Sequence, residues 1–198
     1  MNSVILGIDP GTVVMGYGLI AANNNDIALI EMGVLHLAKY KDHAERLHRI
    51  FAKTESLIKA HKPESMAIEA PFFGKNVQSM LKLGRAQGVA MAAGMTNGLL
   101  AIEYAPRKVK QSVTGRGDAS KEQVWEIIKQ VLHLQADDFG YLDATDAIAV
   151  AICHHYQNRS PLKEIERDSS GSFIKTGKKK KETWGAFIAA NPERIKLQ

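Results

Sequence analysis

Four carboxylates stand at positions where an unpartnered acid would be costly. Asp9 and Glu69 each follow a short apolar run, and Asp143 and Asp146 are three residues apart in a segment rich in Ala, Ile and Val. Carboxylates are rarely buried without a partner, so a shared cation would satisfy several of them at once. A ligand set made only of oxygens suits Mg²⁺ or Mn²⁺. Two such ions about 4 Å apart could activate a water and stabilise the leaving oxygen of a displacement at phosphorus.

Each acid also has a simpler explanation. Asp9 opens an Asp-Pro-Gly tripeptide, which commonly makes a turn. Asp143 and Asp146 fall near the start of an expected helix, where acids interact favourably with the helix dipole whatever the function. Glu69 is harder to explain in this way, because acids are depleted in strands. The metal hypothesis therefore depends on the four residues as a set.

The elements that must position these acids follow from apolar periodicity and turn residues. We predict strands at residues 4–8, 16–20, 27–37, 66–68 and 100–104, and helices at residues 42–60, 76–97, 106–114, 120–132 and 142–155. Pro106 suits the first turn of its helix and Gly115 its end, whereas Ser120 with Gln123 makes a capping-box start. Two of the acids then lie at strand ends, and the other two share one helical face. The pattern predicts an α/β domain with a mixed sheet, antiparallel at its start.

Length and charge bound the domain organisation and the partners. A chain of 198 residues that is 45% hydrophobic is long enough for one sizeable core. We expect one domain over residues 1–158, and a basic, disordered tail over residues 159–198, which are polar and include a run of four lysines. The net charge is +5, and residues 75–121 hold eight Lys or Arg against two acids. A polyanionic partner would explain that segment, and a solvated face with salt bridges to other segments is the alternative.

The compartment is indicated by cysteine use and by the N-terminal residues. Cys153 is the only cysteine, so no internal disulfide can form, and the first 30 residues lack the features of a secretory signal. The most apolar stretch, residues 88–102, is too short and too interrupted for a membrane span. We expect a cytoplasmic protein that does not contact membranes.

Several short motifs, taken together and in order, resemble the RuvC-type Holliday-junction resolvases. They are Leu6-Gly7-Ile8-Asp9-Pro10-Gly11-Thr12, Gly16-Tyr17-Gly18, Ala67-Ile68-Glu69, Lys82-Leu83-Gly84, Lys110-Gln111 and Asp143-Ala144-Thr145-Asp146-Ala147. The resemblance covers residues 3–158. It implies a ribonuclease-H-like fold with a mixed five-stranded sheet flanked by helices, and a homodimer that places paired symmetric nicks in four-way DNA junctions during recombination and repair.

The same resemblance implies the chemistry of the site and its partners. The catalytic, metal-binding carboxylates would be Asp9, Glu69, Asp143 and Asp146, holding two Mg²⁺ ions that Mn²⁺ can replace. The products would carry 5′-phosphate and 3′-hydroxyl ends. A RuvA–RuvB branch-migration complex would be the protein partner.

Five further residues are candidates for DNA contact. Phe72 matches the position of an aromatic that stacks on an exposed base, a contact worth about 1–3 kcal/mol, although a core or surface Phe is the alternative. Lys110 and Lys121 match basic positions near the scissile phosphate, where a cation could neutralise developing charge. Both could instead be ordinary helix-surface lysines. Lys82 and Arg85 belong to the basic segment and complete the set.

Two other function classes share some of these features. The segment from Gly7 to Thr12 also resembles the phosphate-binding turn of actin-like and sugar-kinase phosphotransferases, but those enzymes need two such domains, and a body of about 160 residues is too short for both. The other class is a junction-binding protein without catalysis, against which the complete carboxylate set argues.

Overall fold

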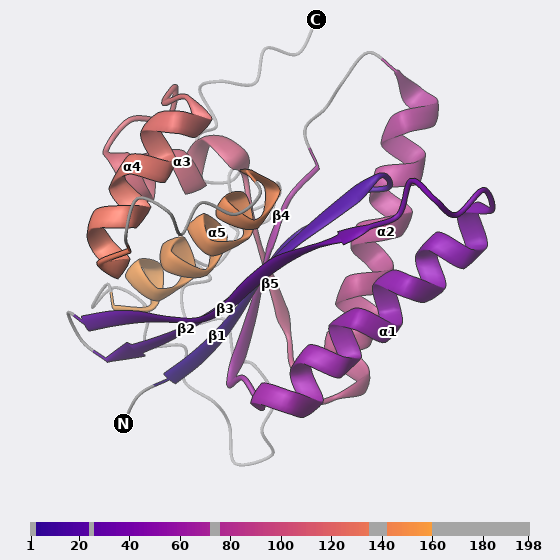
Figure 1. Ribbon diagram of the computed structural model, residues 1–198, viewed down its shortest axis with the longest axis horizontal. Helices are drawn as coiled ribbons and strands as arrows, with labels where there is room; N and C mark the ends of the chain where they lie inside the picture. The colour runs from indigo at the N-terminus through magenta and orange to yellow at the C-terminus, as the bar shows by residue number, and fades with distance from the viewer. Residues whose placement is uncertain (1–2, 24–25, 72–75, 135–141, 160–198) are drawn as a thin grey trace, which may run out of the picture. The chain divides into compact units, whose positions relative to one another are not determined.

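A five-stranded mixed sheet forms the centre of the molecule in the computed structural model, which describes residues 3–23, 26–71, 76–134 and 142–159 (Figure 1). The strands are β1 (Ser3–Asp9), β2 (Val14–Asn23), β3 (Asp26–His36), β4 (Ser65–Glu69) and β5 (Ala101–Tyr104). Their order across the sheet is β3-β2-β1-β4-β5. β1 pairs antiparallel with β2 and parallel with β4, so the predicted mixed sheet with an antiparallel start is confirmed.

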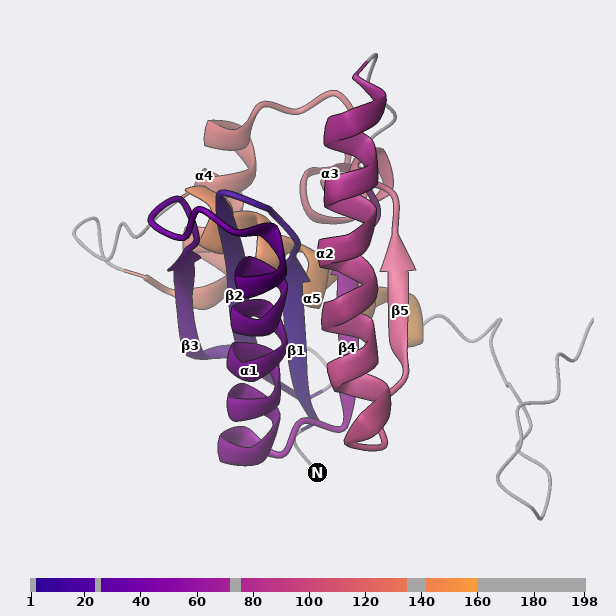
Figure 2. The same ribbon diagram turned by 90° about the vertical axis from the view of Figure 1, so that its right-hand side faces the viewer.

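Helices cover both faces of this sheet. Helices α1 (His43–His61) and α2 (Val77–Thr96) lie side by side on one face, and α3 (Pro106–Thr114), α4 (Lys121–Leu132) and α5 (Leu142–Asn158) lie on the other (Figure 2). None of these helices combines the length and the apolarity that crossing a bilayer requires.

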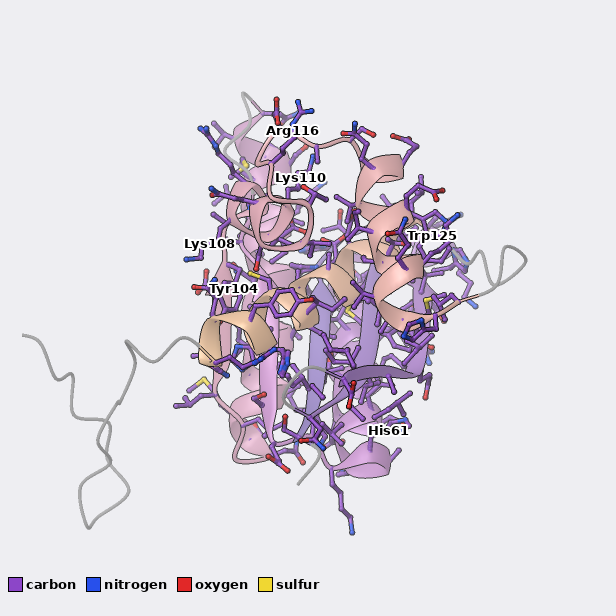
Figure 3. The ribbon with its side chains drawn as sticks, turned by 90° about the vertical axis from the view of Figure 1, so that its left-hand side faces the viewer. His61, Tyr104, Lys108, Lys110, Arg116 and Trp125 are labelled. Carbon is purple, nitrogen blue, oxygen red and sulfur yellow. The ribbon has the colours of Figure 1, made fainter. Side chains whose placement is uncertain are left out.

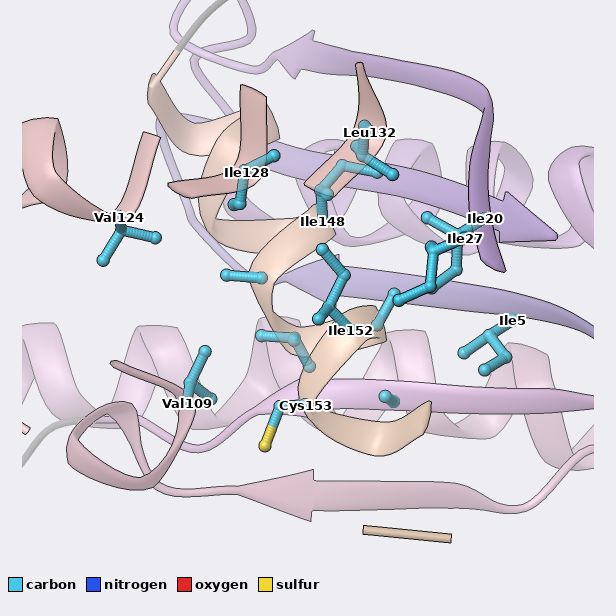
Figure 4. Close-up of a cluster of buried hydrophobic side chains, with 14 of the residues drawn as sticks. Ile5, Ile20, Ile27, Val109, Val124, Ile128, Leu132, Ile148, Ile152 and Cys153 are labelled. Carbon is cyan, nitrogen blue, oxygen red and sulfur yellow. The ribbon is translucent and has the colours of Figure 1, made fainter. Parts of the chain in front are cut away.

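The alternation of strand residues divides the core into two clusters. In β1, Ile5 packs beneath α5 with Ile148 and Ile152 (Figure 4), whereas Leu6 and Ile8 face α1 and α2. Successive strand residues point to opposite faces of a sheet. Asp9 therefore extends the row of Ile5 and projects toward α5.

Three glycines allow α5 to lie directly on the backbone of the sheet. A Cβ at Gly7 would lie 2.1 Å from the Ala147 carbonyl oxygen, and one at Gly16 would lie 1.9 Å from the Asp143 carbonyl oxygen. Gly18, the register partner of Gly7 on β2, would meet the Ile148 side chain at 2.4 Å. The first half of α5 is thereby held against the strand that ends in Asp9.

The helix ends confirm the predictions made from capping residues. Ser120 and Gln123 form the reciprocal capping box that starts α4. Pro106 is the first residue of α3, and Gly115 ends that helix in the left-handed conformation with φ of 78°. The predicted tail from residue 159 onward lies outside the described residues, apart from Arg159, and remains a prediction.

Candidate metal centre

The four predicted carboxylates meet at one edge of the sheet. Asp9 is the last residue of β1 and Glu69 is the last residue of β4. Because Ile8 pairs with Ile68 in the parallel register, the two acids that follow leave adjacent strands at the same edge. Ala67 belongs to the cluster beneath α5, so by the same alternation Glu69 projects toward that face, as Asp9 does.

Helix α5 contributes the other two acids. Asp143 lies in its first turn, and its backbone rests on Gly16, the register partner of Asp9. One carboxylate oxygen each from Asp9, Asp143 and Asp146 can be chosen so that all three lie within 4.8 Å of one another. Glu69 is not a member of this group of three, but it lines the same pocket as Asp9 and Asp146. The structure therefore gathers all four at one place, with Glu69 on the β4 side.

The pocket lined by three of these acids, Asp9, Glu69 and Asp146, has a volume of about 320 Å³. It is lined by Asp9, Pro10, Glu69, Ala70, Pro71, Leu83, Pro106, Lys110, Lys121 and Asp146. Leu83 and the three prolines of this wall were not predicted as site residues, because nothing in their local pattern distinguishes a pocket wall from a core or turn residue.

The electrostatics of the pocket favour a bound cation. Burial raises the pKa of Asp9 well above its ordinary value, and the charges of Glu69 and Asp146 raise it further. Burial and the charge of Asp146 raise the pKa of Glu69 to about 7. Burial also raises the pKa of Asp146. These carboxylates destabilise one another when ionised, and divalent cations with oxygen ligands would offset that repulsion. The donor set therefore fits Mg²⁺ or Mn²⁺.

Lys121 lies within this acidic cluster. The capping box places it at the first position of α4, from which its Nζ donates to an Asp146 carboxylate oxygen and lies 3.7 Å from Asp143 Oδ1. Burial lowers its pKa, but the hydrogen bond to Asp146 and the nearby carboxylate charges outweigh that effect, so the pKa is raised. The lysine, whose side chain is 46% exposed, neutralises part of the cluster.

The other predicted DNA-contact residues differ in their positions. Lys110, on α3, lines the pocket (Figure 3). Lys82 and Arg85 are exposed on α2 and do not line it, although Leu83 between them does. Phe72 lies outside the described residues, so its stacking role remains a prediction.

A buried histidine near the end of the acidic helix α5, His154, makes hydrogen bonds to two side chains. The Asn158 amide donates to His154 Nε2 at 2.8 Å, and Nδ1 then carries the proton and donates to the Tyr104 hydroxyl oxygen at 2.9 Å. Burial raises the pKa of Tyr104 to about 12, so it remains protonated at neutral pH. The contact with Tyr104 ties the end of α5 to β5, so His154 has a structural role at this place.

Comparison with known proteins agrees with this geometry. The sequence model of the family described as "Crossover junction endodeoxyribonuclease RuvC" matches residues 5–154. A crossover junction endodeoxyribonuclease RuvC from Cytophaga hutchinsonii is 50% identical over 196 residues, which cover 99% of this chain and 90% of that protein. This match extends into residues 160–198, beyond the segment that carried the resemblance.

Two solved structures also match the fold. The Thermus thermophilus RuvC structure has a TM-score of 0.71 and 30% identity, with 79% of this chain and 95% of that chain covered. The structure of Thermus thermophilus RuvC in complex with Holliday junction substrate has the same TM-score at 27% identity and the same coverage. The predicted ribonuclease-H-like α/β fold is confirmed. With the family match over three quarters of its length and this close relative, the chain belongs to the RuvC family of crossover junction endodeoxyribonucleases.

Proposed function

We propose that this protein is a structure-selective DNA endonuclease that resolves four-way Holliday junctions by paired symmetric nicks, in homologous recombination and DNA repair. The observation that carries the proposal is a pocket at the edge of the sheet lined by Asp9, Glu69, Asp146, Lys110 and Lys121, with Asp143 grouped beside Asp9 and Asp146. Hydrolysis of a phosphodiester needs stabilisation of negative charge and activation of a water, and this set of side chains suits both tasks.

The four acids have distinct places in this mechanism. Asp9 lies among the other three acids, so it would help to hold Mg²⁺ or Mn²⁺ ions. Glu69 on one side, and Asp143 with Asp146 on the other, would complete the two ligand sets. When bound, such ions would lower the pKa of a water and polarise the phosphoryl oxygens.

The two lysines act on the substrate side of the pocket. Lys110 lines the pocket and makes no ion pair with another described residue. Its charge is therefore available to a phosphate. Lys121 neutralises Asp143 and Asp146 when DNA and ions are absent, and it can turn to a phosphate oxygen when they are present. Both would stabilise the charge that develops as the phosphodiester is cut.

A homodimer would supply two such sites with the symmetry of a four-way junction. The outer face of α2 supports this assembly, because Val77, Leu81 and Met95 are 66%, 51% and 61% exposed on it. On the same face, a Cβ at Gly84 or Gly88 would meet no atom within 4 Å, which leaves room for close approach by a second helix. We propose this face as the dimer interface, a RuvA–RuvB complex as the protein partner, and the cytoplasm as the compartment.

The decisive experiment is cleavage of a synthetic mobile four-way junction beside linear duplex of the same sequence, in Mg²⁺ and in EDTA. We expect symmetric nicks in the junction alone, lost in EDTA and in the Glu69→Gln protein. Glu64→Gln is the matched control, because Glu64 is exposed just before β4 and outside the pocket. Folded wild-type protein that binds the junction in Mg²⁺ and Mn²⁺ without cutting it would contradict the proposal.

A further inference from the structure

A second pocket, of about 510 Å³, adjoins the metal centre at the start of α3. The two share the walls Ala70, Pro71, Pro106 and Lys110. The second pocket, here named the α3 pocket, adds Ala105, Arg107 and Gly117 and contains none of the four carboxylates. If a DNA strand placed one phosphate at the metal centre, its next nucleotide on one side of that phosphate would therefore enter the α3 pocket.

The lining of the α3 pocket has the chemistry of a nucleotide site. Its apolar part is made of Ala and Pro side chains, and among the described residues its charged side chains are the cations Arg107 and Lys110. Ring faces of bases stack or pack on flat apolar surfaces, whereas phosphates are neutralised by arginine and lysine. The volume lies within the range of pockets that hold small organic ligands.

The turn after α3 positions Arg107 for such a contact. A Cβ at Gly117 would lie 2.6 Å from Arg107 Cγ and 3.1 Å from its Nε, so the arginine side chain lies in space that only a glycine leaves open. Gly117 has no left-handed φ that would demand glycine for conformational reasons. The close approach to Arg107 is the physical reason for a glycine at this position.

The guanidinium of Arg107 has no hydrogen-bond or ion-pair partner among the described residues. The charge of Asp118 lies near Arg107, but both carboxylate oxygens of Asp118 accept hydrogen bonds from Arg116, at 3.2 Å each. In the parts of the chain that the structure describes, the Arg107 side chain makes no hydrogen bond or ion pair. An exposed arginine without such a partner is suited to bidentate recognition of a phosphate.

We propose that the α3 pocket holds the nucleotide of the cleaved strand that flanks the scissile phosphate, with its base against Pro71 and Pro106 and its outer phosphate on Arg107. The inference rests on the proposed function and assigns it a substrate subsite. Lys110, shared by both pockets, would lie between the scissile phosphate and its neighbour.

The test measures junction binding by the full-length protein in EDTA as a function of salt, and single-turnover cleavage in Mg²⁺. Arg107→Gln should weaken binding about tenfold and reduce the slope of log affinity against log salt by about 1, the value for one lost phosphate contact. Gly117→Ala should reproduce the slope change with the charge retained, because its Cβ displaces the arginine side chain. Lys108→Gln is the matched control, since Lys108 is exposed on the same helix and extends outward from it (Figure 3), away from both pockets.

A substrate series tests the base contact. Abasic residues are placed one at a time on each side of the cut, and removal of the base in the α3 pocket should weaken wild-type binding about tenfold on one side only. The inference is overturned if Arg107→Gln matches Lys108→Gln in its salt slope, or if neither abasic position matters, while the wild-type protein still cuts the junction. Wild-type protein that binds a junction without cutting it would instead contradict the proposed function.

Discussion

Glu69 is the acid whose protonation should be visible near neutral pH. Its pKa is raised to about 7 by burial and by Asp146, whereas an unfolded chain has a pKa of about 4.5 at this residue. The folded protein therefore binds this proton more tightly than the unfolded protein does. The contribution of Glu69 to the free energy of unfolding is therefore fully present below pH 4.5. It is lost as the pH rises from about 4.5 to about 7.

We predict that the metal-free protein is less stable at pH 8 than at pH 5.5, and that Mg²⁺ restores stability at pH 8. Between pH 5.5 and its pKa of about 7, Glu69 alone would account for a loss of about 2 kcal/mol. Glu69→Gln should remove this share and raise the melting temperature at pH 8 in EDTA. Thermal denaturation in EDTA at the two pH values measures it, with Glu64→Gln as the exposed control. An unchanged difference between the pH values in Glu69→Gln would contradict the assignment.

Lys121 should affect metal binding and cleavage in opposite directions. It occupies Asp143 and Asp146 as a cation, so Lys121→Gln should free those oxygens and strengthen Mn²⁺ binding. The same change should lower single-turnover cleavage roughly 100-fold, because a cation beside the phosphate is lost. Calorimetry with Mn²⁺ and quenched cleavage assays give the two numbers.

Lys129→Gln provides the comparison for Lys121, because Lys129 lies in the last turn of α4 and pairs with Glu126 at 2.7 Å. It should leave metal binding and cleavage unchanged. If Lys121→Gln weakened Mn²⁺ binding, the lysine would be a support for the metal site and not a competitor for its ligands.

At the scale of elements, the site depends on how closely α5 approaches the sheet. Gly16→Ala would bring a Cβ to 1.9 Å from the Asp143 carbonyl oxygen, and neither backbone can move without displacing the acid. We predict a loss of about 3 kcal/mol in unfolding free energy and a loss of Mn²⁺ binding in the protein that remains folded. Urea denaturation and calorimetry measure the two effects.

Gly33→Ala is the matched change in the same sheet. Its Cβ would meet the Tyr17 hydroxyl at 2.5 Å and Cζ at 2.8 Å, so it displaces a ring and not a backbone. It should cost less unfolding free energy than Gly16→Ala, because the ring can shift and because alanine suits a strand better than glycine. Equal losses in the two variants would show that the approach of α5 is not what Gly16 provides.

The elements were predictable because their ends carry local signals. Pro106, Gly115, and Ser120 with Gln123 fix helix ends through their own backbone and side-chain chemistry. The place of Lys121 was not predictable from such signals, because its contact with Asp146 joins helices that are distant in sequence.

The acids carried a local sequence signal for their role, whereas the glycines under α5 did not. Asp9 and Glu69 stood out because acids after apolar strands are unusual, and Asp143 with Asp146 stood out because they share one face of a segment rich in Ala, Ile and Val. The reason for Gly16 and Gly18 could not be found, because a strand glycine that admits a helix has the same local pattern as one in a bulge or turn.

At the scale of the whole molecule, paired cutting requires two copies. If the outer face of α2 is the interface, Met95→Glu should shift the protein from dimer to monomer, because Met95 is 61% exposed in the single chain and would be buried in the pair. It should also uncouple the two nicks, so that singly cut junctions accumulate. Sedimentation equilibrium and analysis of nicked intermediates measure these effects.

Ile30→Glu tests whether a charge at any exposed apolar residue would dissociate the dimer. Ile30 is 41% exposed on β3, at the other edge of the sheet from β5 and away from α2. It should leave the dimer and the paired nicks intact. A Met95→Glu protein that remained dimeric would place the interface elsewhere.

The packing of α5 on β1 and β2 also has a consequence during synthesis. The three-stranded meander is complete at His36, whereas the helix that covers one of its faces begins only at Leu142, about 100 residues later. At translation rates of about 5–20 residues per second, that apolar face leaves the ribosome on the order of 5–20 s before its cover. Asp9 lacks Asp143 and Asp146 for the same interval, so under the proposed function a nascent chain would not complete its metal-binding carboxylates until α5 emerges.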